Sequence, residues 1–238
     1  MCVVDASPPW RRRVDDGESM REGADVRGRA HDRPFVRNGN ATHSVAELRE
    51  VMRSDLFRHA GDTRAVSLLR HLVLTPGFIY TVTMRVTGHL RTTRSALRLL
   101  YPFAKGALIH YERKYGIHMS EKVSVGPGLF INGFGGIRVH SDASIGSNCN
   151  LHYGNVLALT NRGVREGCPR IGDRVQLSAR AMIVGRVTVG DDAIVGANAV
   201  VTKDVPAHGV AVGVPAKIIS TAGSSTYVNN LWPCRSFI

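Results

Sequence analysis

The chain has 238 residues, of which 43% are hydrophobic and 6% are aromatic, and its formal net charge at pH 7 is +12. This hydrophobic content excludes a chain that is disordered throughout and predicts one main folded domain. The largest share of the basic excess lies between residues 46 and 120, where helices are expected. We therefore expect no nucleic-acid partner, while a basic helical face leaves peripheral contact with an anionic membrane surface open.

The four cysteines, Cys2, Cys149, Cys168 and Cys234, show no paired spacing. Neither a disulfide framework nor a thiolate zinc site is indicated, so we expect no metal and a reducing, cytoplasmic location. The N-terminal residues lack the three-part pattern of a secretory signal, and no segment reaches about 18 uninterrupted apolar residues.

Residues 1–44 mix Arg, Asp, Gly and Pro without hydrophobic periodicity and are interpreted as a flexible leader. An α-helical region is expected from residue 45 to 120, starting at a capping box formed by Ser44 and Glu47. Thr75-Pro76-Gly77 should break the helix, and two further apolar runs follow, Phe78–Leu90 and Ala96–Tyr111. These amphipathic helices are expected to pack on one another or on a neighbouring subunit more readily than on lipid.

A six-residue repeat dominates the second half of the chain. From residue 171 it reads IGDRVQ, LSARAM, IVGRVT, VGDDAI, VGANAV and VTKDVP. Each hexad predicts one short strand and a turn, three hexads close a triangular coil, and coils stack as a parallel β-helix with the repeated aliphatic residues inside. We expect this domain over residues 121–220, with an inert buried Cys149, and a capping or interfacial tail over residues 221–238.

The segment from Ala158 to Arg170 departs from the repeat. Loops on a rigid scaffold often present functional groups, so this excursion is expected to shape an acceptor pocket; a tolerated surface insertion is the alternative.

The sequence resembles the hexapeptide-repeat acyltransferases, and more closely the serine acetyltransferases and their relatives in polysaccharide gene sets. Four features carry this resemblance: the hexads, the segment GVPAKII at 213–219, FGGI at 134–137 and the VTKDVP ending. The resemblance implies a left-handed parallel β-helix preceded by α-helices, a trimer or dimer of trimers, and acetyl-CoA as acyl donor. It places acetyl-CoA in a groove between neighbouring β-helices and assigns its binding to Ala179, Gly185, Gly196, Ala197, Lys203 and Lys217.

The family's catalytic groups do not carry over. Its histidine base falls on Gly133, with Asn132 where a carboxylate often stands, His118 at the place of a supporting carboxylate and Cys168 at that of a second histidine. Acyl transfer to a hydroxyl needs a base of near-neutral pKa. The repeat stacks His152 over Asn132, so His152 is the first candidate for the base and His118 the second; a merely solvated His152 is the alternative.

Several functions remain in view. O-acetyl transfer to L-serine is the leading hypothesis, and acetylation of a saccharide hydroxyl is the second. A catalytically silent β-helix that binds acyl-CoA or assembles with an active partner is the third. A zinc hydratase resembling the γ-type carbonic anhydrases needs three converging histidines, and His140 and His152 alone do not supply them. Cys168 as a nucleophile lacks a visible partner in the sequence.

Overall fold

The computed structural model describes residues 42, 44–133 and 135–233, all within one compact unit that spans Phe35–Ile238. The leader expected over residues 1–44 lies almost wholly outside the described residues. The helices are α1 (Val45–Ala60), α2 (Ala65–Leu74), α3 (Pro76–Thr92), the 3₁₀ turn η2 (Ala96–Leu100) and α4 (Tyr101–Tyr115). The β-structure begins directly afterwards at Ile117, so His118 belongs to the first strand.

The helix boundaries follow the expected local signals. Ser44 caps α1, because its hydroxyl accepts a hydrogen bond from the Glu47 amide at 3.1 Å. The expected break at Thr75 is confirmed: α2 and α3 meet there at 103°. No single helix in the described part of the chain is long and apolar enough to cross a membrane, although α2 and α3 together pass that test by length and composition.

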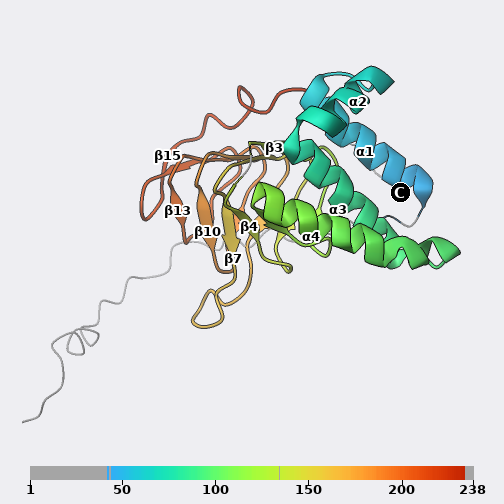
Figure 1. Ribbon diagram of the computed structural model, residues 1–238. Helices are drawn as coiled ribbons and strands as arrows, with labels where there is room; N and C mark the ends of the chain where they lie inside the picture. Colours follow the sequence, from blue (N-terminus) through green and yellow to red (C-terminus); the bar gives the residue numbers. More distant parts are fainter. Residues whose placement is uncertain (1–41, 43, 134, 234–238) are drawn as a thin grey trace, which may run out of the picture. The chain divides into compact units, whose positions relative to one another are not determined.

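Among the described residues fifteen short strands follow, and all but the last wind into five stacked coils (Figure 1). Their bounds are β1 Ile117–Met119, β2 Ser124–Val125, β3 Phe130–Asn132, β4 Ile137–Val139, β5 Ser144–Ile145, β6 Asn150–His152, β7 Val156–Ala158, β8 Arg170–Ile171, β9 Gln176–Leu177, β10 Met182–Val184, β11 Thr188–Val189, β12 Ile194–Val195, β13 Val200–Val201, β14 Val210–Val212 and β15 Lys217–Ser220.

The first four coils each contribute one strand to each of three parallel faces, and the fifth contributes β13 and β14, which confirms the left-handed parallel β-helix. Face A has the order β1-β4-β7-β10-β13, face B has β11-β8-β5-β2, and face C has β14-β12-β9-β6-β3 with β15 added antiparallel at its end. We call the turns that lead from C to A the C–A edge, those from A to B the A–B edge, and those from B to C the B–C edge.

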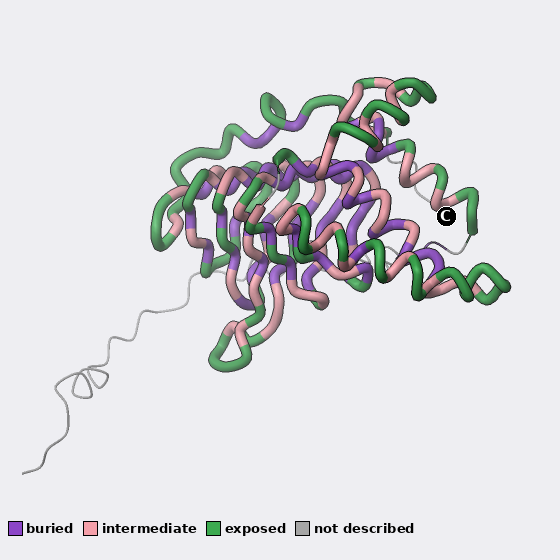
Figure 2. Tube along the Cα trace, in the orientation of Figure 1, coloured by how far each residue is buried: buried purple, intermediate pink, exposed green. Residues whose placement is uncertain are grey.

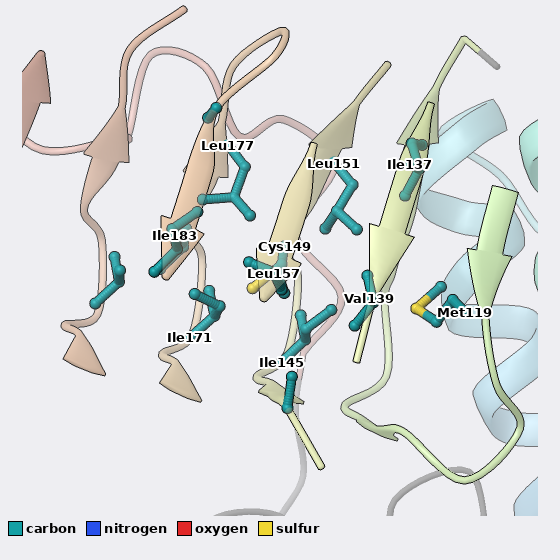
Figure 3. Close-up of a cluster of buried hydrophobic side chains, with 14 of the residues drawn as sticks. Met119, Ile137, Val139, Ile145, Cys149, Leu151, Leu157, Ile171, Leu177 and Ile183 are labelled. Atoms are coloured by element: carbon teal, nitrogen blue, oxygen red, sulfur yellow. The ribbon is translucent and has the colours of Figure 1, made fainter. Parts of the chain in front are cut away.

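The repeated aliphatic residues fill the inside of the coils. Buried residues recur in successive coils (Figure 2). Ile171, Leu177 and Ile183 are fully buried, and so is Cys149, as expected (Figure 3). Burial raises the pKa of the Cys149 thiol to about 12, which makes this cysteine unreactive. Glycine is required at the second position of a hexad, since a Cβ on Gly172 would lie 2.8 Å from the Asp191 amide nitrogen of the next coil.

Helices α1 and α3 clamp the first coil through a buried ion pair. Arg85 of α3 bonds Asp55 of α1, with 3.0 Å between Nε and Oδ2, and its other nitrogens donate to the carbonyls of Val125 and Gly126, each at 2.7 Å. Asp55 in turn accepts from the Leu129 amide at 2.8 Å. Because both ions are almost completely inaccessible and their hydrogen-bonding groups are matched, the helices are tied to the turn between β2 and β3.

The described part of the C-terminal tail runs back across the coils along the B–C edge (Figure 1). Ser224 bonds the Asp192 carbonyl through its amide at 2.8 Å, the Tyr227 carbonyl accepts from Asn150 at 3.1 Å, and Trp232 exchanges two hydrogen bonds with Asn148. The tail was expected to be capping or interfacial. Its described part instead forms hydrogen bonds with successive coils of its own chain.

The ring of His59 on α1 is held in apolar surroundings, 4.6 Å from the Phe130 ring and 5.4 Å from the Phe78 ring between centroids. Its Nε2 is enclosed and has no hydrogen-bond partner among the described residues. Burial, assisted by the nearby His71 and Arg58, lowers the pKa of His59 from 6.5 to about 3.

We therefore expect acid to destabilise the fold through His59. The unfolded chain takes up this proton first as the pH falls, so stability is unaffected above about pH 6.5 and declines toward about pH 3. The loss from this one group is about 2 kcal/mol between neutral pH and about pH 5. Urea titrations of wild type and His59→Phe at both pH values measure it, with exposed His110→Gln as control; a stability difference independent of pH would contradict the prediction.

Candidate functional site

His152 lies where the repeat predicted, at the C–A edge above Asn132. The strands β3 and β6 pair in parallel with Asn132 opposite His152, and 3.5 Å separates the Asn132 amide nitrogen from His152 Nδ1. Tyr153 follows beside Gly133, whose own φ of 86° suits a residue without a side chain. The stacking that led to this candidate is thus confirmed.

A chain of side-chain hydrogen bonds ends on the His152 ring. Arg58 of α1 donates to Asn150 Oδ1, Asn150 Nδ2 lies 2.7 Å from Gln176 Oε1, and Gln176 Nε2 lies 2.9 Å from His152 Nε2. An arginine can only donate, so it orients the Asn150 amide and, through that, the Gln176 amide. The Gln176 N–H therefore points at the imidazole.

This polarity sets the protonation of His152. Its Nε2 must accept, which places the single proton of the neutral ring on Nδ1. The exposed Asn132 amide must then turn its oxygen toward that proton, because the amide nitrogen can only donate. Burial lowers the pKa of His152, and a donor facing Nε2 opposes the imidazolium as well. The ring is accordingly held neutral, but its basic nitrogen is engaged by Gln176.

Gln176→Glu should reverse this arrangement. A carboxylate beside Nε2 favours a proton there, so the pKa of His152 should rise by about 1 unit or more and the neutral ring should change to the Nε2–H form. Nitrogen–proton NMR of the histidine rings measures both quantities, with exposed His118 as internal control. A wild-type ring already protonated on Nε2 would contradict the proposed polarity.

The second base candidate, His118, is not brought to His152. It is exposed on face A in β1, next to Arg138 in the neighbouring strand, whereas His152 ends β6 on face C. Within one chain the two histidines therefore cannot be members of a single hydrogen-bonded pair in this geometry.

The six residues expected to bind acetyl-CoA lie at two different edges of the β-helix. Ala179, Gly196 and Ala197 lie at the C–A edge, and Lys217 begins β15 beside it; Gly185 and Lys203 lie at the A–B edge. Both lysines are exposed. A groove between two neighbouring β-helices can take one edge from each, whereas a groove on one chain cannot use all six residues together.

Two of the glycines in this set have roles inside the chain itself. A Cβ on Gly196 would meet Val212 Cγ1 at 2.7 Å, and a Cβ on Gly185 would meet the Arg165 carbonyl oxygen at 2.8 Å. Coil stacking and the packing of the excursion thus require these glycines whether or not a ligand approaches them.

The excursion leaves the coils after β7 and projects from the A–B edge (Figure 1). Its base is closed by paired backbone hydrogen bonds between Thr160 and Gly167, at 2.8 and 3.0 Å. Val164 near its tip is 92% exposed, so the tip has no apolar packing within the described chain. The expectation that this segment departs from the repeat is confirmed.

Cys168, at the return of the excursion, does have a partner, and the expectation that it lacks one is wrong. Its Sγ lies 3.1 Å from His140 Nδ1, and Asp142 Oδ2 lies 3.8 Å from the same nitrogen. Register could have indicated this contact, because Ile145 stacks under Ile171, and counting back from that pair brings Cys168 over the turn that holds Asp142. The six-residue count does not predict this contact, because the excursion between β7 and β8 is not a whole number of hexads.

Comparison with known proteins identifies the relatives of this architecture. Residues 168–203 match the family model described as bacterial transferase hexapeptide (six repeats). A serine acetyltransferase of Staphylococcus aureus is 31% identical over 153 residues, which cover 58% of this chain and 72% of that protein. The chain belongs to the serine acetyltransferase family of hexapeptide-repeat acyltransferases.

Other members of the family agree with this assignment. The serine acetyltransferase of Helicobacter pylori is 36% identical over 105 residues, which is 44% of this chain and 61% of that relative's length. The crystal structure of the serine acetyltransferase from Brucella abortus superposes with a TM-score of 0.63 at 26% identity, covering 76% of this chain and 72% of the other. The likeness therefore includes helices as well as coils.

Proposed function

We propose that this chain is an acetyl-CoA-dependent O-acetyltransferase with L-serine as acceptor. The observation that carries the proposal is the superposition on a serine acetyltransferase over 76% of the chain, at 26% identity. One solved relative, from soybean, is described as complexed with serine, and it matches with a TM-score of 0.60 over 73% of this chain at 28% identity. A serine-sized acceptor follows from these likenesses.

The donor is proposed to lie between two copies of the chain. The six candidate residues occupy both edges of face A, and a trimer of β-helices would place a C–A edge against an A–B edge. Exposed Lys203 and Lys217 supply cations for the phosphates of acetyl-CoA, and Ala179 and Ala197 leave room for its pantetheine arm. Light scattering coupled to gel filtration tests the trimer or dimer of trimers that this arrangement needs.

His152 is proposed as the base that takes the proton of the acceptor hydroxyl as it attacks the thioester carbonyl. Its lowered pKa keeps it neutral at physiological pH, which suits a proton acceptor. The hydroxyl must displace the Gln176 amide from Nε2, and the Nδ1–H group then needs the oxygen of the Asn132 amide as its acceptor. His118 remains the second candidate for the base. It lies on face A, and in an oligomer face A of one copy can lie beside the donor bound between two copies.

A saccharide hydroxyl is the alternative acceptor, favoured by one feature of the C–A edge. Gly133 and Asn132 stand where the family resemblance implies a histidine and a carboxylate, so the groups that would hold serine are changed. The exposed excursion offers a further surface that differs from the regular coil.

The experiment that tests the proposal measures thiol release from acetyl-CoA with the full chain. Release that depends on L-serine supports serine acetylation, and release that depends only on sugars supports the alternative. Acetyl-CoA binding without acceptor-dependent release would refute both and favour a catalytically silent β-helix.

A further inference from the structure

Three side chains with different ligand atoms meet at the A–B edge. His140 Nδ1 lies 3.1 Å from Cys168 Sγ and 3.8 Å from Asp142 Oδ2, and all three ligand atoms lie within 4.8 Å of one another. Among the described residues, no side-chain hydrogen bond joins this cluster to the His152 chain of hydrogen bonds, which lies on the C–A edge. The proposed acetyl transfer leaves its function unexplained.

Two successive coils build the cluster. His140 follows β4 and Asp142 precedes β5 in one coil, whereas Cys168 precedes β8 in the next. The parallel pairing of Ser144 with Arg170 holds these two turns in register. The ligands therefore stand on the rigid coils, and their spacing does not depend on the tip of the excursion.

The spacing is close to that of a tetrahedral metal site. A zinc ion bound to one thiolate, one imidazole and one carboxylate separates neighbouring ligand atoms by roughly 3.4–3.6 Å, from its usual bond lengths. The nitrogen–sulfur distance of 3.1 Å and the nitrogen–oxygen distance of 3.8 Å bracket that range. Rotation of the Asp142 side chain, which is 75% exposed, supplies the remaining adjustment.

We propose that His140, Asp142 and Cys168 bind one divalent cation of the Zn²⁺ class, with no fourth ligand assigned from the described residues. Thiolate and imidazole ligands favour Zn²⁺ over Mg²⁺ or Ca²⁺, which prefer oxygen. Binding exchanges the Cys168 thiol proton, released to the buffer, for a metal–sulfur bond. It also takes the Nδ1 lone pair, which now accepts from the Asp142 amide at 3.3 Å, so that amide turns to solvent.

The cation fastens the excursion. Cys168 lies in the returning part of that segment, and the other two ligands belong to the preceding coil. The metal therefore joins the loop's return to the scaffold, with His140 and Cys168 28 residues apart in sequence. The expectation that the cysteine spacing indicates no zinc site fails on this proposal, because the ligands come from different coils and not from one local motif.

Metal binding is tested on the full chain carrying Cys2→Ser and Cys234→Ser, so that Cys149 and Cys168 are the remaining thiols. Metal-free protein is dialysed against Zn²⁺, and Co²⁺ is titrated while thiolate-to-cobalt charge-transfer absorption is recorded. We expect one equivalent of metal per chain and a charge-transfer band. Cys168→Ala should abolish the band and weaken Zn²⁺ binding by at least about 100-fold, since loss of a mere supporting group costs 10–100-fold.

Matched controls separate the site from general effects. Cys149→Ala removes the buried thiol, and His152→Ala removes a histidine from the other edge; both should keep the stoichiometry and the band. His140→Ala should weaken binding as Cys168→Ala does, while the melting temperature of each metal-free variant confirms that it folds. Binding of less than one equivalent, or binding that survives Cys168→Ala, overturns the proposal, in which case the 3.1 Å contact is a thiol–imidazole hydrogen bond alone.

Discussion

Replacing Arg85 by methionine is expected to lower the free energy of unfolding by about 3–5 kcal/mol, because it leaves Asp55 as an unpaired charge inside the protein. The side chains of Arg85 and Asp55 are 1% and 0% exposed. The carbonyls of Val125 and Gly126 also lose the donors that lie 2.7 Å away. A loss of this size is a large part of the stability of an ordinary domain.

Urea unfolding at fixed protein concentration measures the effect of Arg85→Met. The matched control is Arg165→Met, because Arg165 and Asp204 form an ion pair of similar length, 3.1 Å, whose side chains are 41% and 60% exposed. That variant should lose no more than about 1 kcal/mol. A double variant that adds Asp55→Leu should recover part of the Arg85→Met loss, and a loss below about 1 kcal/mol for Arg85→Met alone would contradict the clamp.

Removal of the His152 imidazole should reduce kcat/KM for acetyl transfer by about 10²–10⁴, the usual contribution of a general base. The expectation applies to His152→Ala assayed with the acceptor on which thiol release depends. The ring sits on β6 with its Nε2 within 2.9 Å of Gln176, so the substitution removes a group at the coil surface and leaves the buried Leu151 in place.

The control for this loss is His110→Ala, which removes an exposed histidine from α4. A pH–rate profile adds a readout that a structural defect would not shift: Gln176→Glu should move the acidic limb of kcat/KM to higher pH together with the pKa of His152. If His152→Ala keeps activity within about tenfold of wild type, His152 is not the general base. His118 is then assigned as the base if His118→Ala shows the larger loss.

The two catalytic candidates show how far the repeat alone can reach. The six-residue period correctly stacked His152 over Asn132, because parallel pairing of successive coils follows from the inward position of each aliphatic residue. Nothing in the period indicates Gln176 as the group that orients His152. The hydrogen-bond chain that orients Gln176 starts at Arg58 on α1, which is separated from Asn150 by 92 residues in the sequence.

The cysteines give the same lesson in both directions. Cys149 was placed correctly as core, since its hexad position points inward in every coil. Cys168 acquires His140 as a neighbour only because the excursion returns to the A–B edge in register with the coil before it. An insertion of irregular length shifts the positions that follow it relative to the six-residue repeat, so the repeat alone cannot predict which residues stack there.

The sequence by itself determined the β-helix, its inward columns, the helix break at Thr75 and the cap at Ser44, because each depends on contacts that recur at a fixed spacing or within one turn. Only the tertiary structure decided the Arg85–Asp55 ion pair, the path of the C-terminal tail, the hydrogen-bond chain that ends at His152 and the cluster at His140. Each of these joins side chains from elements whose separation along the chain follows no period, so chain folding alone brings them within hydrogen-bonding distance.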